Sequence, residues 1–243
     1  MPGQPSPIET MPNQILGTIH TVLHGRAQPY RHMDGRPGGL SAIAKQAVSG
    51  PVRATALGLE GDEQGDLRVH GGPDKAIHHY AREHYEAWRA ELGELPVLAA
   101  PPAFGENFSS TGVTESDICL GDQVRAGTCL LEVSQSRQPC WKLNVRLGVA
   151  DMALRVQRSG RTGWYYRVLK PGMVQAGDEL QLMARPHPEW PLSRVIHLLY
   201  TDVLNLADLR ALSKLPLPAS WEKLVGRRLD SHSLENWDRR TLG

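Results

Sequence analysis

Cys140 is the residue whose chemical type and neighbours most clearly indicate reactivity in this sequence. It follows Pro139 and lies between two basic residues, Arg137 and Lys142. Nearby positive charge favours the thiolate form of a cysteine, which is both the nucleophile and the metal ligand. Because proline restricts the backbone and donates no hydrogen bond, we expect Cys140 to lie on a fixed turn at the end of a strand. The alternative, that Cys140 is a small buried hydrophobic residue like most free cysteines, stays open.

A pair of adjacent glycines, Gly71 and Gly72, forms a second candidate site. Such glycines expose backbone N–H groups, and the neighbouring His70 and Lys75 add positive charge, so the segment suits an anionic ligand such as a phosphate. The same residue types are also ordinary turn formers. The glycines complete neither a dinucleotide-binding motif nor a Walker motif, and the histidines that follow lack zinc-site spacing.

A glycine-rich turn at residues 58–62 allows the same two interpretations. It is either a polar loop at the edge of a pocket or a surface turn whose glycines supply positive φ.

The elements that must position these residues are mainly short strands separated by glycine turns. The predicted strands are residues 15–24, 52–57, 113–120, 123–125, 129–133, 163–169 and 179–183. We expect residues 163–169 and 179–183 to pair as a hairpin. Helices are predicted at residues 82–92 and 151–159. Many short strands with few helices predict a β-barrel.

The composition changes at residues 185–191, where prolines indicate a linker. Helices are predicted beyond it at residues 193–200, 202–212 and 221–229, with Ser220 as the N-cap of the last. Short amphipathic helices are not stable alone, so we expect them to pack as a bundle against the barrel.

The predicted fold is therefore mainly β, with three parts along the chain. They are a disordered tail at residues 1–14, a β-barrel domain with inserted helices at residues 15–187, and a small three-helix domain at residues 188–243. Two arginine pairs in the last part, Arg227 with Arg228 and Arg239 with Arg240, are interpreted as a solvated face. The alternative is a docking patch for an acidic redox partner.

The overall charge gives no indication of a nucleic acid or membrane partner. The 243 residues carry 27 lysines and arginines against 26 aspartates and glutamates, a net charge of +1. The sequence contains no apolar run of the roughly 18 residues that a membrane span needs. Its three scattered cysteines do not suggest a disulfide framework. We expect a cytoplasmic protein, and the helices beyond the barrel are compatible with a homodimer.

Five motifs together resemble one known family. They are Gly-Leu-Glu-Gly-Asp at residues 58–62, Val-His-Gly-Gly-Pro-Asp-Lys-Ala at 69–76, Phe-Gly-Glu-Asn at 104–107, Ser-Gln-Ser-Arg-Gln-Pro-Cys at 134–140 and Gly-Trp-Tyr-Tyr at 163–166. In this order and rough spacing they resemble the MOSC domain proteins of the YiiM type. Residues 190–229 resemble the three-helix appendage of that group.

The resemblance implies a β-barrel that binds the molybdenum cofactor (molybdopterin), with Cys140 as a ligand of molybdenum. Soft thiolate ligation suits that metal. The residues that the resemblance assigns to the phosphate or the pterin edge are His70, Gly71, Gly72, Lys75 and Arg137, with Ser41 and Lys45 in an N-terminal contact region. Asn107 and Ser134 are expected to hydrogen-bond the pterin. His79 and Tyr80 are expected to line the substrate pocket.

The activity that the resemblance implies is the reduction of N-hydroxylated compounds, such as 6-hydroxylaminopurine, to amines, which is a detoxification reaction. The chain has no cysteine cluster for an iron–sulfur centre, so electrons are expected from a separate protein. Two alternatives remain. One is a non-catalytic module that binds the cofactor or carries sulfur on Cys140, and the other is a purely structural barrel.

Overall fold

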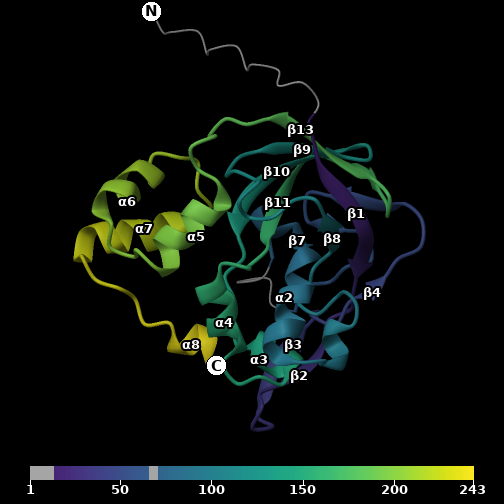
Figure 1. Ribbon diagram of the computed structural model, residues 1–243, viewed down its shortest axis with the longest axis horizontal. Coiled ribbons are helices and arrows are strands. Elements are labelled where there is room, and N and C mark those ends of the chain that lie inside the picture. Colours follow the sequence, from purple (N-terminus) through teal and green to yellow (C-terminus); the bar gives the residue numbers. More distant parts are fainter. Residues whose placement is uncertain (1–13, 66–70) are drawn as a thin grey trace, which may run out of the picture.

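The computed structural model describes residues 14–65 and 71–243, and seven of its strands form a closed barrel (Figure 1). The barrel strands are β1 (Gln14–His24), β7 (Ile77–Ala81), β8 (Phe108–Thr111), β9 (Gln123–Ala126), β10 (Cys129–Ser136), β11 (Trp164–Lys170) and β13 (Glu179–Ala184). Their order is β13-β9-β10-β11-β7-β8-β1, and β1 also pairs with β13, which closes the sheet. Closure leaves no open sheet edge in the barrel wall. The predicted barrel is therefore confirmed.

Shorter elements decorate the barrel. The additional strands are β2 (Gln28–Arg31), β3 (Pro37–Ser41), β4 (Gln46–Ala47), β5 (Val52–Thr55), β6 (Gly58–Leu59) and β12 (Gly172–Val174). Two 3-10 turns, η1 (Pro73–Lys75) and η2 (Pro96–Leu98), and three helices, α2 (Glu83–Leu92), α3 (Lys142–Leu147) and α4 (Met152–Ser159), lie between barrel strands. The helices predicted at residues 82–92 and 151–159 are thus confirmed, whereas α3 was not expected.

The C-terminal part is helical, as predicted. Its helices are α5 (Leu192–Tyr200), α6 (Leu206–Leu212), α7 (Ala219–Ser231) and the short α8 (Asp238–Thr241), which the sequence did not reveal. Helix α6 is shorter than predicted because Asn205 caps it, accepting a hydrogen bond from the backbone N–H of Asp208. Ser220 lies inside α7 and not at its N-cap, which is Pro218.

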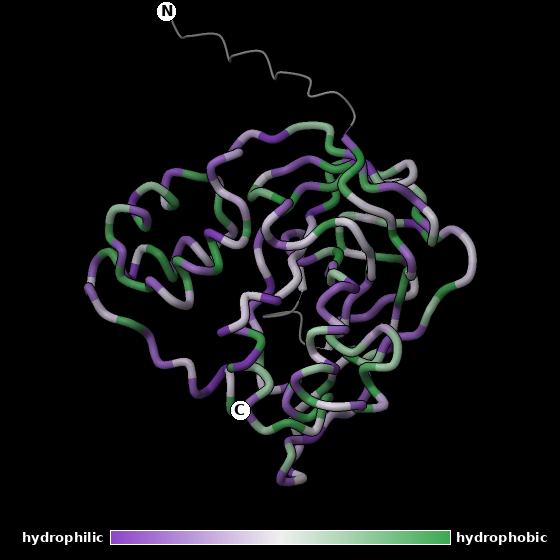
Figure 2. Tube along the Cα trace, in the orientation of Figure 1, coloured by the Kyte–Doolittle hydropathy of each residue, from purple (hydrophilic) through white to green (hydrophobic). Residues whose placement is uncertain are grey.

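The helical part shares a core with the barrel. Helices α5, α6 and α7 lie side by side at one flank of the barrel (Figure 1). One hydrophobic cluster joins Val133 of β10 to Val195 of α5 and Trp221 of α7. Polar and apolar stretches alternate along the chain in both parts (Figure 2), as expected where each element buries one side only. A second cluster, around Tyr80, Trp88 and Phe104, fills the space beneath α2, α3 and α4.

Residues 113–120 are not a strand, which corrects the prediction. Apart from one bridge at Cys119 they form turns, and residues 108–111 supply the strand instead. Local side-chain bonds favour the turns: Asp117 accepts hydrogen bonds from the N–H and hydroxyl of Thr114. Such side-chain bonds compete with a sheet ladder for the same backbone groups.

The predicted hairpin between residues 163–169 and 179–183 is also wrong, although both strands exist. Strand β11 pairs with β10 and β7, whereas β13 pairs with β9 and β1. Between them in the chain, β12 pairs with β5, and in the barrel strands β10 and β9 separate β11 from β13. Strand β13 therefore closes the barrel rather than extending a hairpin.

Candidate functional site

A cavity of about 90 Å³ opens where four loops meet at one end of the barrel. It is bounded by the segment after β3, the loop after β6, the loop before β8 and the connection from β10 to α3. Its lining residues are Ser41, Ala42, Ile43, Lys45, Asp62, Glu63, Gln64, Gly65, Lys75, His78, Phe104, Gly105, Asn107, Arg137, Cys140, Lys142 and Tyr165. Four of these side chains are basic and two are carboxylates, so the lining suits an anionic ligand.

Cys140 lies in the connection between β10 and α3 and lines this cavity. Strand β10 ends at Ser136, and the following residue is held by a hydrogen bond from the N–H of Arg137 to the carbonyl of Gly163, 2.9 Å long. The carbonyl of Cys140 accepts a 2.9 Å hydrogen bond from the N–H of Leu143, which starts the turn into α3. The expected fixed turn at the end of a strand is confirmed, and the cysteine is 9% exposed.

The cavity contains two buried side chains with unused hydrogen-bonding atoms. Arg137 is 6% exposed and His78 is 4% exposed. Among the residues that the structure describes, neither Nη1 of Arg137 nor Nε2 of His78 has a hydrogen-bond partner. Burial, and then the nearby Arg137 charge, lower the pKa of His78 well below its usual value, so the imidazole is neutral at neutral pH. A buried polar atom without a partner calls for an explanation, such as a bound water, an ion or a ligand.

A buried ion pair forms one wall of the cavity. Lys45 donates a hydrogen bond to Asp62, and the side chains of the pair are 6% and 4% exposed. Burial lowers the pKa of Lys45, while the carboxylate of Asp62 acts in the opposite direction. Asp62 also accepts hydrogen bonds from Asn107, at 2.8 Å, and from the N–H of Gly25, at 2.8 Å. The carboxylate therefore fixes three segments that are distant in the sequence.

The side-chain amide of Asn107 forms three hydrogen bonds within the cavity wall. Its amide nitrogen donates to Asp62 and to the carbonyl of Leu23, at 2.8 and 3.0 Å, and its oxygen accepts from the N–H of His78 at 3.0 Å. Both amide protons are thus used by the protein. Asn107 is placed to position His78 and the end of β1, with one oxygen lone pair left for a ligand.

The remaining basic side chains come from η1 and α3. Lys142 donates a 2.9 Å hydrogen bond to the carbonyl of Leu40. Burial lowers the pKa of Lys75, while Asp74 and Cys140 act to raise it. Both lysines line the cavity with Cys140, and Lys45 adds a third basic side chain from the segment after β3.

The predicted site residues divide into two groups. Those that line the cavity are Ser41, Lys45, Lys75, Asn107, Arg137 and Cys140. Gly71 and Gly72 lead into η1 instead, and Gly72 has a φ of 95°, which favours glycine. His70 lies outside the described residues. The structure therefore brings together six of the twelve predicted residues, while their roles in binding stay predictions.

Three predicted residues lie away from the cavity for a clear physical reason. The hydroxyl of Ser134 lies within hydrogen-bond distance of the carbonyls of Asp74 and Tyr165 and can donate its one proton to either, so it holds η1 against β11. His79 is fully buried, stacks on Trp164 at 4.1 Å and shares a hydrogen bond with the hydroxyl of Ser110.

Tyr80 is also fully buried, and its hydroxyl accepts a 2.7 Å hydrogen bond from Trp88. The expectation that His79 and Tyr80 line a substrate pocket is corrected, since both lie in the core. Alternate residues of a strand face opposite sides, so His78 faces the cavity where its neighbour His79 does not.

Several lining residues were missed in the sequence. Asp62 ends the glycine-rich turn that had two interpretations, and the structure places it in the cavity wall. His78 and Tyr165 sit on strands β7 and β11, where only the pairing of the strands brings them together. Glu106 supports this wall from behind: it is fully buried and accepts hydrogen bonds from Tyr85 and from the N–H of Phe104.

The described residues contain neither a metal-ligand cluster nor a helix suited to a membrane. Across residues 14–65 and 71–243, no group of three or more histidine, cysteine, aspartate and glutamate side chains could hold a metal ion. No helix in the described part of the chain is both long and apolar enough to cross a membrane.

Comparison with known proteins agrees with this architecture. Residues 66–181 match the MOSC domain, and residues 190–232 match the YiiM-like, 3-alpha helix domain. The chain is 41% identical to Protein YiiM of Escherichia coli over 91% of its length and 97% of that protein. The chain belongs to the MOSC family and is of the YiiM type.

One solved structure and one further relative extend this result. The crystal structure of YiiM from Escherichia coli superposes with a TM-score of 0.77 at 33% identity, covering 96% of this chain and 100% of that one. A protein of Gibberella moniliformis named Reductase is 37% identical to this chain. The match covers 93% of this chain and 40% of that protein. This family relationship confirms the resemblance that the five motifs indicated.

Proposed function

We propose that this chain is a molybdenum-cofactor-dependent reductase of N-hydroxylated compounds, such as 6-hydroxylaminopurine, in which Cys140 ligates the molybdenum. The observation that supports the proposal most directly is that Cys140, Arg137 and His78 line one cavity, and that Nη1 of Arg137 and Nε2 of His78 are buried without a hydrogen-bond partner among the described residues. A soft thiolate and an anion-binding guanidinium match the two ends of a phosphorylated pterin dithiolene complex. Family membership and a relative named Reductase support the same reaction class.

The residues present fit that cofactor. Arg137 offers a buried, unpaired cationic donor, and Lys45, Lys75 and Lys142 add positive charge around the same opening. An anionic phosphate or pterin edge would satisfy the guanidinium. A cofactor that brings its own sulfur ligands needs only one protein ligand, which agrees with the absence of a metal-binding cluster among the described residues.

The bound cofactor would supply the two-electron chemistry, in which the N–O bond breaks, two electrons and two protons are consumed, and the products are an amine and water. The chain's own residues bind, orient and shield. His78 lines the cavity as a neutral imidazole, because burial lowers its pKa well below the usual value. Asn107 fixes the position of His78, and the Lys45–Asp62 pair keeps the wall rigid.

Electrons are proposed to come from a separate redox protein in the cytoplasm. The chain has three cysteines, at positions 119, 129 and 140, so it lacks the four thiolates that an iron–sulfur cluster of the common type requires. Burial raises the pKa of Cys119 and of Cys129 to about 11, so both are neutral thiols at neutral pH. No nucleic acid or membrane partner is proposed, and a homodimer stays an expectation.

Replacement of Cys140 by serine tests the proposal. Serine has a similar size but is a hard, poorly ionised ligand, so Cys140→Ser should fold normally, lose bound molybdenum and lose reductase activity. The assay combines metal analysis of freshly purified protein with dye-coupled reduction of 6-hydroxylaminopurine. Cys119→Ser is the matched control, because Cys119 lies outside the cavity, and it should keep both properties.

Full activity in Cys140→Ser would refute the assignment. A wild-type chain that carries a persulfide on Cys140 and no molybdenum would favour the sulfur-carrier alternative instead. A purely structural barrel would show neither molybdenum nor reductase activity in the wild type, and Cys140→Ala would keep every measurable property.

A further inference from the structure

The C-terminal segment of the chain contacts the backbone on both sides of Cys140. Helix α8 lies beside α3 and α4 at the end of the barrel (Figure 1), about 100 residues from them in the sequence. The guanidinium of Arg240 donates hydrogen bonds to the carbonyl of Pro139 and to Oε1 of Gln157. The backbone carbonyl of Arg240 accepts a 2.8 Å hydrogen bond from the N–H of Trp141. Residues 139 and 141 flank Cys140, so one arginine holds both neighbours.

We propose that Arg240 is a positioning residue that fixes the Cys140 turn, and that the C-terminal helical part thereby helps to build the barrel's site. The contribution of the helical part to the site rests on the proposed function of Cys140, whereas the holding of the turn by Arg240 does not. Residues 137–140 belong to no helix or strand, so few backbone bonds of their own keep them in place. A donor to the Pro139 carbonyl and an acceptor for the Trp141 N–H supply what regular structure does not.

The backbone carbonyl of Arg240 also binds the N-terminal end of helix α3. Trp141 is the N-cap of α3, and no side chain caps that helix end. The first N–H groups of a helix have no partner within the helix, so the Arg240 carbonyl satisfies one that would otherwise be orphaned. A second bond, 2.8 Å from the amide of Asn144 to the carbonyl of Thr241, attaches the next turn of α3 to the same segment.

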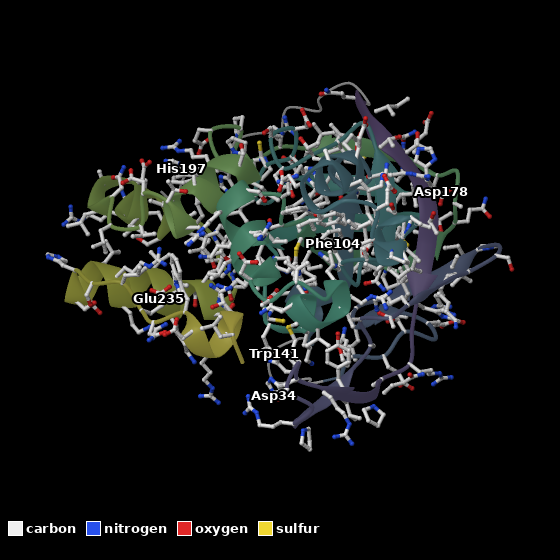
Figure 3. The ribbon with its side chains drawn as sticks, turned by 60° about the horizontal axis from the view of Figure 1, so that its bottom comes forward. Asp34, Phe104, Trp141, Asp178, His197 and Glu235 are labelled. Atoms are coloured by element: carbon white, nitrogen blue, oxygen red, sulfur yellow. The ribbon has the colours of Figure 1, made fainter. Side chains whose placement is uncertain are left out.

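The segment that carries Arg240 is itself anchored in the helical part. Arg228 of α7 is fully buried and forms a two-bond ion pair with Glu235, at 2.7 and 3.0 Å. The indole N–H of Trp237 donates a 2.8 Å hydrogen bond to the same carboxylate, and its ring packs edge-on against Tyr200 of α5. Figure 3 shows Glu235 on the C-terminal segment and Trp141 beside the end of that segment. A continuous series of contacts therefore connects α5 and α7, through the C-terminal segment, to the Cys140 turn.

Alkylation of individual cysteines tests the proposal without the cofactor. The full-length chain is purified from cells unable to make molybdopterin, treated with iodoacetamide, and the labelling rate of each cysteine is followed by mass spectrometry. In Arg240→Ala the turn opens more often, and loss of a charged hydrogen bond predicts a rise of about tenfold in the labelling of Cys140. Cys119 and Cys129 are buried elsewhere and serve as internal references.

The neighbouring residue supplies the matched control. Arg239 is exposed, so Arg239→Ala should label at the wild-type rate. Arg240→Lys retains one charged donor and should fall between wild type and Arg240→Ala. An unchanged Cys140 rate in Arg240→Ala overturns the proposal, as does an equal acceleration of all three cysteines, because that would report general destabilisation. A chain that never binds molybdenum would refute the reductase but leave this result intact.

Discussion

The unpaired Nη1 atom of Arg137 predicts opposite effects on stability and on binding when this side chain is replaced. In the chain without a ligand, Arg137 is 6% exposed and its Nη1 has no partner among the described residues. A buried polar group left unsatisfied costs about 1–3 kcal/mol, and more when it is charged. Arg137→Met keeps much of the side chain's apolar length and removes the charge. The free energy of unfolding of the empty chain should therefore rise by about 1–3 kcal/mol.

The same substitution should weaken cofactor retention. If an anionic group of the cofactor completes the hydrogen bonding of Arg137, its loss costs about 1.5–3 kcal/mol of binding free energy. This corresponds to a fall in affinity of roughly 10- to 150-fold. A binding arginine of this kind lowers the stability of the empty protein and raises that of the occupied protein. A structural arginine would raise the stability of both.

Two measurements on the same preparations separate these outcomes. Thermal unfolding of the empty chain should show an increase in Tm of about 2–4 °C for each kcal/mol gained in a chain of this size. Molybdenum content after dialysis reports retention. Arg210→Met, on the exposed face of α6, is the control and should change neither. A lower Tm in empty Arg137→Met would show that the guanidinium has a structural partner, and unchanged molybdenum content would show that it does not bind the cofactor.

Two further predictions concern buried groups. Burial lowers the pKa of His79 from 6.5 to about 3, so between these values the unfolded chain binds a proton that the folded chain does not, and stability falls as the pH falls through this window. His79→Gln should reduce that slope by about 1.4 kcal/mol per pH unit, measured from urea midpoints at several pH values, and an unchanged slope would contradict it. Asp62→Ala should cost about 3–5 kcal/mol in urea unfolding because Lys45 loses its buried partner. The double change Lys45→Met with Asp62→Leu should recover most of this loss, and no recovery would argue against the pair as the cause.

Local signals in the sequence were sufficient for much of the fold. The strand periodicity of residues 15–24 and the aromatic run at residues 163–169 correspond to β1 and β11. The apolar spacing of Tyr85 and Trp88 correctly placed α2 and its buried face. These features depend on residues within one element, so no knowledge of the partner strand was needed.

Pairing between distant strands could not be derived in the same way. Strand β8 pairs in parallel with β7 and antiparallel with β1, and its sequence, Phe-Ser-Ser-Thr, has little strand character of its own. Its serines 109 and 110 are fully buried because neighbouring strands enclose them. The assignment of His79 to the pocket failed for a related reason, since which face of β7 points into the cavity depends on the barrel's closure.

The cavity shows the same division between local and distant information. Cys140, Pro139 and Arg137 are adjacent in the sequence, so their turn could be predicted from residue types alone. Asp62 and His78 reach the same place from other segments, and only the hydrogen bonds through Asn107 join them. A charge that is buried and unpaired has no sequence signature, because burial is a property of the folded chain.

The two arginine pairs show how neighbouring residues of one type can have different roles. In a helix with 3.6 residues per turn, adjacent side chains point about 100° apart, so one member of a pair can face the protein while the other faces water. The expected solvated face is therefore half right: Arg227 and Arg239 are exposed, whereas Arg228 is fully buried. Arg240 is partly buried and is bonded to the Pro139 carbonyl. An acidic redox partner could meet only the outward arginine of each pair, while the inward ones connect α7 and α8 to the turn that presents Cys140.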